Sequence, residues 1–234
     1  MRFLRADEYQ ELMRFLERAY GHGRGFFVRS SPRLRVEAED SSLILRSENK
    51  ILGHVGIYPL EFVVGPSTIT AGGIGAVGVD PRARGRGYMS SLMERSIQIM
   101  EERKIPLSVL WGNRQRYMHF GYEVCGQKYQ LEFDRRSLAR AGIEPSEVEE
   151  VDPCDKAVIE RIRELHATLN YRVARHTLDL LLSKPKVRVF MGEEGYLISV
   201  NEYKGDLVLQ EVVSPVAKEA ELILGAMDWA FAEK

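Results

Sequence analysis

The chain has 234 residues, 44% of them hydrophobic and 29% charged, a balance typical of a folded globular protein with a hydrophobic core. Its formal net charge of −1 argues against nucleic acid or an anionic membrane as the main partner. There is no long apolar run, the charged first residues predict no signal peptide, and the two cysteines lack metal-type spacing. We therefore expect a cytoplasmic protein without a metal site.

The first third of the chain predicts a helix followed by strands. Residues 7–20 carry apolar side chains at helical spacing, and the glycines at 21–25 end that helix in a loop. Strands are predicted at 42–46, 51–64 and 73–79. The last of these is rich in glycine, which weakens a strand interior and often marks a close approach by a ligand or another element. A cofactor arm lying along the strand and a helix packed tightly on it are the two alternatives.

Arginine and glycine alternate in the loop that follows, Arg82-Ala83-Arg84-Gly85-Arg86-Gly87. From Gly87 onward, apolar residues at helical spacing predict an amphipathic helix that begins at these glycines. Unpaired N–H groups at a helix start, closely approachable glycines and three arginines together predict an anion site. The alternative is an ordinary turn with solvated arginines.

A short helix with a tyrosine follows the next strand, which is predicted at 107–111. Asn113 can cap this short helix, which carries Tyr117, and Gly121 fits its C-terminal end. Further strands are predicted at 122–125 and 128–133. The first half of the chain thus predicts an α/β fold, and the family resemblance described below implies a mixed central sheet flanked by helices.

The second half repeats this order of elements. An acidic, proline-containing linker is predicted at 141–155. Helices are predicted at 155–170 and 176–183, strands at 186–191, 195–202 and 206–213, and a final helix in the last 20 or so residues. Where the first half has its arginine-glycine loop, the second has Ser214-Pro215-Val216-Ala217. That loop has neither glycine nor arginine, so we expect no phosphate site there.

The spacing Arg82-x-x-Gly85-x-Gly87 resembles the loop with which the GCN5-related N-acetyltransferase (GNAT) superfamily holds the pyrophosphate of acetyl-CoA. Tyr117-Met118-His119-Phe120-Gly121-Tyr122 is similar to a second motif of the Eis-like subgroup. The two motifs span residues 73–125. The resemblance implies a GNAT fold at 1–135, followed at 150–234 by a degenerate or partial GNAT-like domain without a phosphate-binding loop. Eis-like proteins carry a third domain, so the chain is either naturally short or a fragment.

The resemblance also implies an activity: transfer of an acetyl group from acetyl-CoA, without a metal, to an amine of a small molecule or peptide. Tyr117 would protonate the departing thiolate, and a backbone N–H of 77–79 would stabilise the oxyanion. The residues expected to bind the cofactor are Val77, Gly78, Val79, Arg82, Arg84, Gly85, Arg86, Gly87, Tyr88, Met89, Ser90 and Asn113. The general base stays open among His54, Glu61 and His119.

Two other functions remain open at this point. One is a non-catalytic acyl-CoA-binding regulatory module in which Tyr117 is merely packed. The other is a nucleotide-phosphate protein, although the Gly-x-x-x-x-Gly-Lys-Ser/Thr pattern of a P-loop is absent. The identity of the acceptor amine and association with further copies of the chain are not determined by the sequence.

Overall fold

The computed structural model describes all residues except 32, 33, 35–37, 48, 128, 176, 177, 179–181, 183, 204, 205, 233 and 234. The chain divides into two compact units, Met1–Gly126 and Gln127–Lys234. No helix among the described residues is long and apolar enough to span a membrane.

The first unit is built on a mixed sheet with the strand order β1-β2-β3-β4-β5, in which neighbours are antiparallel except the parallel pair β4 and β5. Its strands are β1 (Arg2–Phe3), β2 (Ser42–Ser47), β3 (Lys50–Val64), β4 (Ser67–Val79) and β5 (Leu107–Leu110). Its helices are η1 (Ala6–Glu8), α1 (Tyr9–Tyr20), α2 (Phe26–Ser30), α4 (Ala38–Ser41), η2 (Pro81–Ala83), α5 (Tyr88–Glu102), α6 (Arg114–Tyr117) and η3 (Met118–Phe120).

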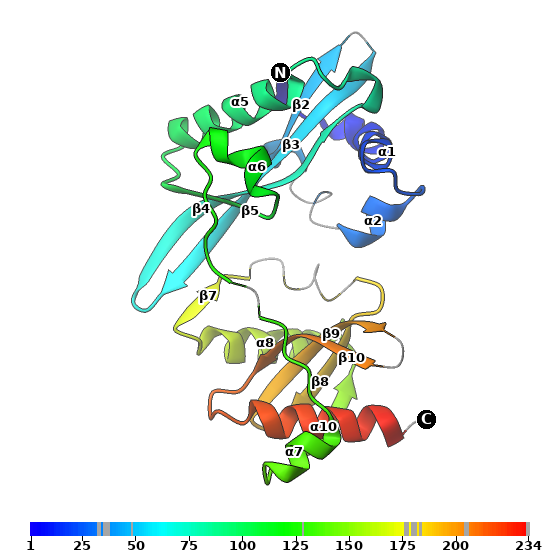
Figure 1. Cartoon of the computed structure of the whole chain (residues 1–234), viewed down its shortest axis with the longest axis vertical. Helices are drawn as coiled ribbons and strands as arrows, with labels where there is room; N and C mark the ends of the chain where they lie inside the picture. Colours follow the sequence, from blue (N-terminus) through cyan, green and yellow to red (C-terminus); the bar gives the residue numbers. More distant parts are fainter. Residues whose placement is uncertain are drawn as a thin grey trace. The chain divides into compact units, whose positions relative to one another are not determined.

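Helices α1 and α5 cover opposite faces of this sheet (Figure 1). Side chains alternate between the faces of a strand, so Ile44 of β2 packs in the cluster with Leu12 and Leu16 of α1. The neighbouring Leu43 packs in the other cluster, with Leu92 and Met93 of α5. The apolar stripes predicted for the two helices are therefore the surfaces that they bury.

Glycines in the central strands let both helices come close. A Cβ on Gly53 would lie 2.6 Å from Leu92 of α5, and one on Gly72 would collide with Met100 of the same helix. On the other face, a Cβ on Gly78 would lie 3.3 Å from Ala19 of α1. Tight helix packing, the second of the two alternatives for this glycine-rich strand, is therefore present.

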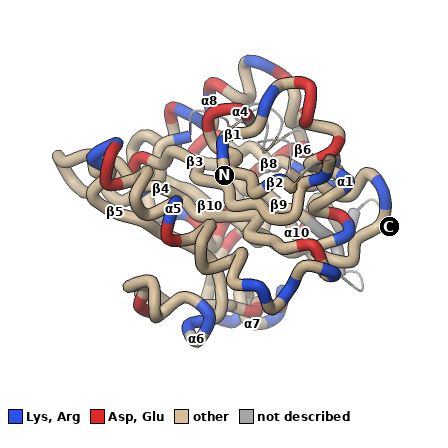
Figure 2. The backbone as a smooth tube through the Cα atoms, turned by 90° about the horizontal axis from the view of Figure 1, so that it is seen from above, with Lys and Arg blue, Asp and Glu red and all other residues tan. Residues whose placement is uncertain are grey.

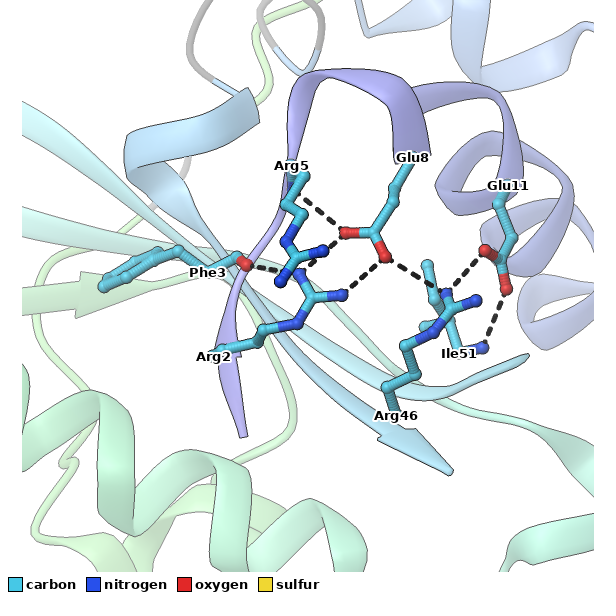
Figure 3. Close-up of polar contacts among 7 residues, drawn as sticks. All are labelled: Arg2, Phe3, Arg5, Glu8, Glu11, Arg46 and Ile51. Atoms are coloured by element: carbon cyan, nitrogen blue, oxygen red, sulfur yellow. Dashed lines mark hydrogen bonds and ion pairs between the residues drawn. The ribbon is translucent and has the colours of Figure 1, made fainter. Parts of the chain in front are cut away.

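A charged network ties the start of the chain to α1 and the sheet (Figure 3). Glu8 accepts two hydrogen bonds from Arg2, at 2.6 and 2.7 Å, and lies 3.3 Å from Arg46 of β2. Arg46 also donates to Glu11 of α1 at 2.6 Å. The hydrogen bond from Arg2 is the main reason that the pKa of Glu8 falls to about 2. This network holds α1 on the sheet at the end where the chain begins.

The second unit is a separate α/β unit with an antiparallel sheet in the order β10-β9-β8-β6. Its strands are β6 (Val148–Val151), β7 (Tyr171–Val173), β8 (Arg188–Gly192), β9 (Gly195–Tyr203) and β10 (Asp206–Val213), and its helices α7 (Arg135–Arg140), α8 (Lys156–Ala167) and α10 (Glu219–Ala232). Val189 packs with α8 and the adjacent Phe190 packs with α10, so one helix covers each face (Figure 1).

Three predictions of the sequence differ from these elements. Residues 122–125 and the described part of 128–133 form no strand. Their alternating apolar side chains are exposed, for example Val124 at 73% and Tyr129 at 75%, because no neighbouring strand among the described residues bonds them. The predicted linker at 141–155 contains the edge strand β6, which pairs with β8. The helix predicted at 176–183 lies mostly outside the described residues.

Candidate active site

The loop between β4 and α5 exposes a row of backbone N–H groups. It begins at Asp80, whose carboxylate accepts the N–H of Arg82 at 3.0 Å. Gly85 and Gly87 then adopt φ angles of +77° and +74°, a conformation that costs other residues roughly 1–2 kcal/mol. Gly87 is the N-cap of α5 and offers no side chain to the helix start. Within the described chain the N–H groups of residues 85–90 have no acceptor, which suits an anion.

Three exposed arginines, Arg82, Arg84 and Arg86, lie in the same loop as these N–H groups. The Nη2 atom of Arg84 donates to the carbonyl oxygen of Ala19, at 3.0 Å, in the last turn of α1. A helix leaves such carbonyls unpaired, so Arg84 ties the loop to α1. The side chains of Arg82 and Arg86 bond no partner among the described residues, which leaves their charge available to a ligand.

Strands β4 and β5 separate before β4 ends. Their parallel pairing stops where Ile74 lies opposite Leu110, whereas β4 continues to Val79. On its other side β4 stays paired with β3, and the N–H of Asp80 donates to that strand at 2.8 Å. Since successive N–H groups of a strand point to opposite sides, those of Val79 and Val77 face away from β3. They line an open strand edge next to the loop.

A β-bulge interrupts the pairing of β4 with β3 beside this edge. Gly75 and Gly78 face residues of β3 only two positions apart, so Ala76 and Val77 together lie opposite one residue. Ala76 has a φ of +50°, which is unusual for a residue with a side chain. Bulges of this kind redirect a strand locally.

His54 lies under the bulge and is fully buried. Its Nδ1 is 2.8 Å from the carbonyl oxygen of Ala76, and because a carbonyl can only accept, Nδ1 carries the proton. Burial lowers the pKa of His54 to about 4, so the ring is neutral at pH 7. Buried in this way, His54 cannot reach an acceptor amine, and it is not the general base that the sequence left open.

Three tyrosines gather near the open edge of β4. The hydroxyl of Tyr20 donates to the carbonyl oxygen of Val77 at 2.9 Å, and burial, followed by the nearby phenol of Tyr117, raises the pKa of Tyr20 to about 12. Tyr122 lies with its ring centroid 6.3 Å from that of Tyr117, edge to face. Burial is the first cause that raises the pKa of Tyr122, and Tyr117 adds to it.

Only one of these three phenols keeps a free proton. Ser108 donates to the carbonyl oxygen of Gly72 at 3.0 Å, so at the 2.6 Å contact between Ser108 and Tyr122 the tyrosine is the donor. The proton of Tyr20 is likewise bonded. Tyr117 is 8% exposed and its hydroxyl has no hydrogen-bond partner in the described part of the chain. It is therefore the phenol best able to give its proton to a ligand.

The remaining predicted site residues take up other positions. Asn113 caps α6 as predicted, since its Oδ1 accepts the N–H of Gln115 at 2.8 Å, and with Arg114 and Arg116 this helix is a basic segment (Figure 2). Glu61 lies opposite Thr70 of β4. Thr70 is seven residues before Val77, so Glu61 is about 20 Å from Val77 along the strand. His119 is exposed in η3, with its ring tilted against that of Phe120 at a centroid distance of 4.0 Å.

The mixed sheet with diverging central strands, and the glycine loop between β4 and α5, define the fold of this unit as the GNAT fold. The chain belongs to that family: residues 1–125 match the family described as the acetyltransferase (GNAT) domain. A search of curated proteins finds no significant match.

The solved structures that this chain resembles match residues of both units. A GCN5-related N-acetyltransferase from Kribbella flavida is 22% identical with a TM-score of 0.75, over 95% of this chain and 59% of that one. A protein from Enterococcus faecalis, described as a probable N-acyltransferase, is 19% identical with a TM-score of 0.72, over 96% and 60%. Eis1 from Mycobacterium abscessus is 16% identical with a TM-score of 0.66, over 97% and 61%. At these identities the likeness establishes the fold, and the chain spans about three fifths of the length of these structures.

Sequence reasoning missed the contributions of Tyr20, His54 and Ala76 to this edge. Tyr20 belongs to an ordinary apolar stripe, and nothing in the spacing indicates that its hydroxyl reaches Val77. The bulge has no signal except the surrounding glycines, because a positive φ at Ala76 cannot be inferred from alanine itself.

Proposed function

We propose that the protein is an acetyl-CoA-dependent N-acetyltransferase that acts on an amine of a small molecule or peptide. The proposal rests on one arrangement of groups. The N–H groups at the start of α5 have no acceptor in the described part of the chain and follow directly on the open edge of β4. The hydroxyl of Tyr117, which has no hydrogen-bond partner among the described residues, lies near Tyr20, whose hydroxyl donates to the Val77 carbonyl on that edge.

The cofactor would bind along these donors. Its pyrophosphate would accept N–H groups of residues 85–90, assisted by the positive end of the α5 dipole and by the charge of Arg82 and Arg86. Its pantetheine arm has amides that can pair with the open edge of β4 at Val77 and Val79, as an added strand would. The Nδ2 group of Asn113 is not needed for the helix cap and could donate to the cofactor.

The chemistry then follows from three groups. A neutral amine attacks the thioester carbonyl carbon, and the N–H of Val77 or Val79 stabilises the oxyanion that forms. The C–S bond breaks as the amide forms, and the sulfur takes the proton of Tyr117. A thiol has a pKa of about 8.5 and a tyrosine about 10, so this transfer needs only modest tuning. The amine loses its proton to a base that we leave unassigned.

Several features support an Eis-like member with a degenerate second unit. The fold likeness to Eis1 extends over both units. In the second unit the loop before α10 is tied to its own unit: Ser214 Oγ accepts the N–H of Lys218 at 3.1 Å, and the ammonium of Lys218 pairs with Glu194 at 2.5 Å. In the first unit the side chains of Arg82 and Arg86 have no such partner among the described residues. We infer that only the first unit binds acetyl-CoA.

The test is release of free thiol from acetyl-CoA across a panel of aminoglycosides, polyamines, amino acids and lysine peptides. The proposal predicts turnover with at least one class and its loss in Tyr117→Phe. If acetyl-CoA binds but no amine stimulates thiol release, and Tyr117→Phe binds as wild type, the protein is instead an acyl-CoA-binding module.

A further inference from the structure

Burying the imidazole of His54 costs free energy of folding, and the fold itself does not require a histidine at this position. It is fully buried, its Nδ1–H is bonded to the carbonyl oxygen of Ala76, and its Nε2 has no hydrogen-bond partner among the described residues. A buried acceptor without a partner destabilises the folded state. An apolar side chain at this position would avoid that penalty, so the bond from Nδ1 must contribute something else.

That bond holds the most unusual residue of β4. Ala76 has a φ of +50° and stands in the bulge immediately before Val77. A residue with a Cβ stays in this conformation only when its surroundings determine it. The hydrogen bond from His54 fixes the carbonyl of Ala76, and the orientation of that peptide sets the direction of the Val77 N–H, since both belong to the same peptide plane.

We propose that His54 is a positioning residue that locks the β4 bulge so that the N–H groups of Val77 and Val79 point at the thioester carbonyl of the bound cofactor. This inference rests on the proposed function, because the donors matter only if a thioester lies along the edge. His54 itself touches neither the cofactor nor the acceptor.

Two substitutions of similar size separate the hydrogen bond from the packing. In His54→Asn the side-chain Nδ2 occupies nearly the position of Nδ1 and can donate to the Ala76 carbonyl, while the unbonded Nε2 disappears. In His54→Leu the volume is similar but no donor remains. A third variant, His54→Leu with Ala76→Gly, removes the donor and also the backbone strain, because glycine adopts a positive φ freely.

Two readouts are needed, both well below the melting temperature of each variant. The first is kcat and the KM for acetyl-CoA in the thiol-release assay. The second is amide hydrogen exchange of residues 76–79 in the ligand-free protein, which does not depend on activity. For His54→Leu we expect kcat to fall about tenfold or more with little change in KM, and exchange at 76–79 to accelerate. His54→Asn should restore both, and the glycine double variant should restore part of kcat.

His54→Leu with the kcat and exchange of the wild type would overturn the inference, and so would equal losses of kcat in the Asn and Leu variants. Failure of the proposed function looks different: the wild type then releases no thiol with any amine. The exchange measurement would in that case still decide whether His54 holds the bulge.

Discussion

Replacing Gly87 by alanine tests the contribution of the backbone conformation of the cofactor loop separately from that of the loop's charged side chains. Gly87 has a φ of +74° and is the N-cap of α5. A Cβ built there meets no atom within 4 Å, so the substitution introduces no clash, only backbone strain. That strain is worth about 1–2 kcal/mol. The loop can remain strained and lose this much stability, or relax and turn its N–H groups away.

Because the loop is exposed, we expect it to relax, and relaxation weakens acetyl-CoA binding if the loop holds the pyrophosphate. Hydrogen bonds to a charged group contribute about 1.5–3 kcal/mol each, so misdirecting a single N–H should raise the Kd about tenfold, and two about a hundredfold. We expect calorimetric titration with acetyl-CoA to show a loss within this range.

Gly65→Ala is the matched control. Gly65 lies in the turn between β3 and β4 of the same unit, has a φ of +56° and likewise has open space for a Cβ. Both variants should lose comparable stability in thermal unfolding, and only Gly87→Ala should lose affinity. Equal affinities in the two variants would refute the assignment of the loop.

Three further predictions concern single side chains. Tyr117→Phe should lower turnover by about 10²–10⁴-fold with unchanged acetyl-CoA affinity, whereas Tyr122→Phe, which loses only a bond to Ser108, should change turnover much less; similar rates in both would remove Tyr117 from the chemistry. The pKa of His54 is about 4 when folded and 6.5 in its ordinary state, so protonation favours unfolding, and the free energy of unfolding should fall by about 3 kcal/mol as the pH drops from 6.5 to 4. Urea titrations should show that His54→Asn lacks this component, and an identical pH dependence in both proteins would contradict it. Ser214→Ala should cost about 1 kcal/mol of stability and leave acetyl-CoA binding intact, and a weakened affinity would place the cofactor in the second unit.

Elements with strong periodicity were predictable from the sequence. The apolar stripe from Met89 to Met100 indicated α5, and the glycine loop indicated where it begins, because helical spacing and left-handed glycines are local properties. The cap at Asn113 and the stop at Gly121 were also predicted, and both are present. The strands predicted at 122–125 and 128–133 are wrong for the described residues of these ranges. Apolar and polar residues alternate there, but a strand also requires a hydrogen-bonded neighbour, which alternation cannot supply.

The candidate site likewise has a part that local sequence predicts and a part that only the tertiary structure shows. Its loop is one continuous segment and could be identified from residue order. The open edge of β4 depends on where β5 stops pairing, and the bonds of Tyr20 and His54 join residues 57 and 22 positions apart. Such contacts follow from the tertiary fold and leave no pattern in the sequence. Arg84 is an intermediate case: its place in the loop was predicted, and its bond to Ala19 was not.

The most direct test of the account is a crystal structure of the protein with acetyl-CoA bound. The account predicts the pyrophosphate on the N–H groups of residues 85–90, the pantetheine arm paired with the edge of β4, and the thioester sulfur within hydrogen-bonding distance of the Tyr117 hydroxyl. A cofactor whose phosphates lie at Ser214 to Lys218, or one bound to the first unit away from β4, would contradict it.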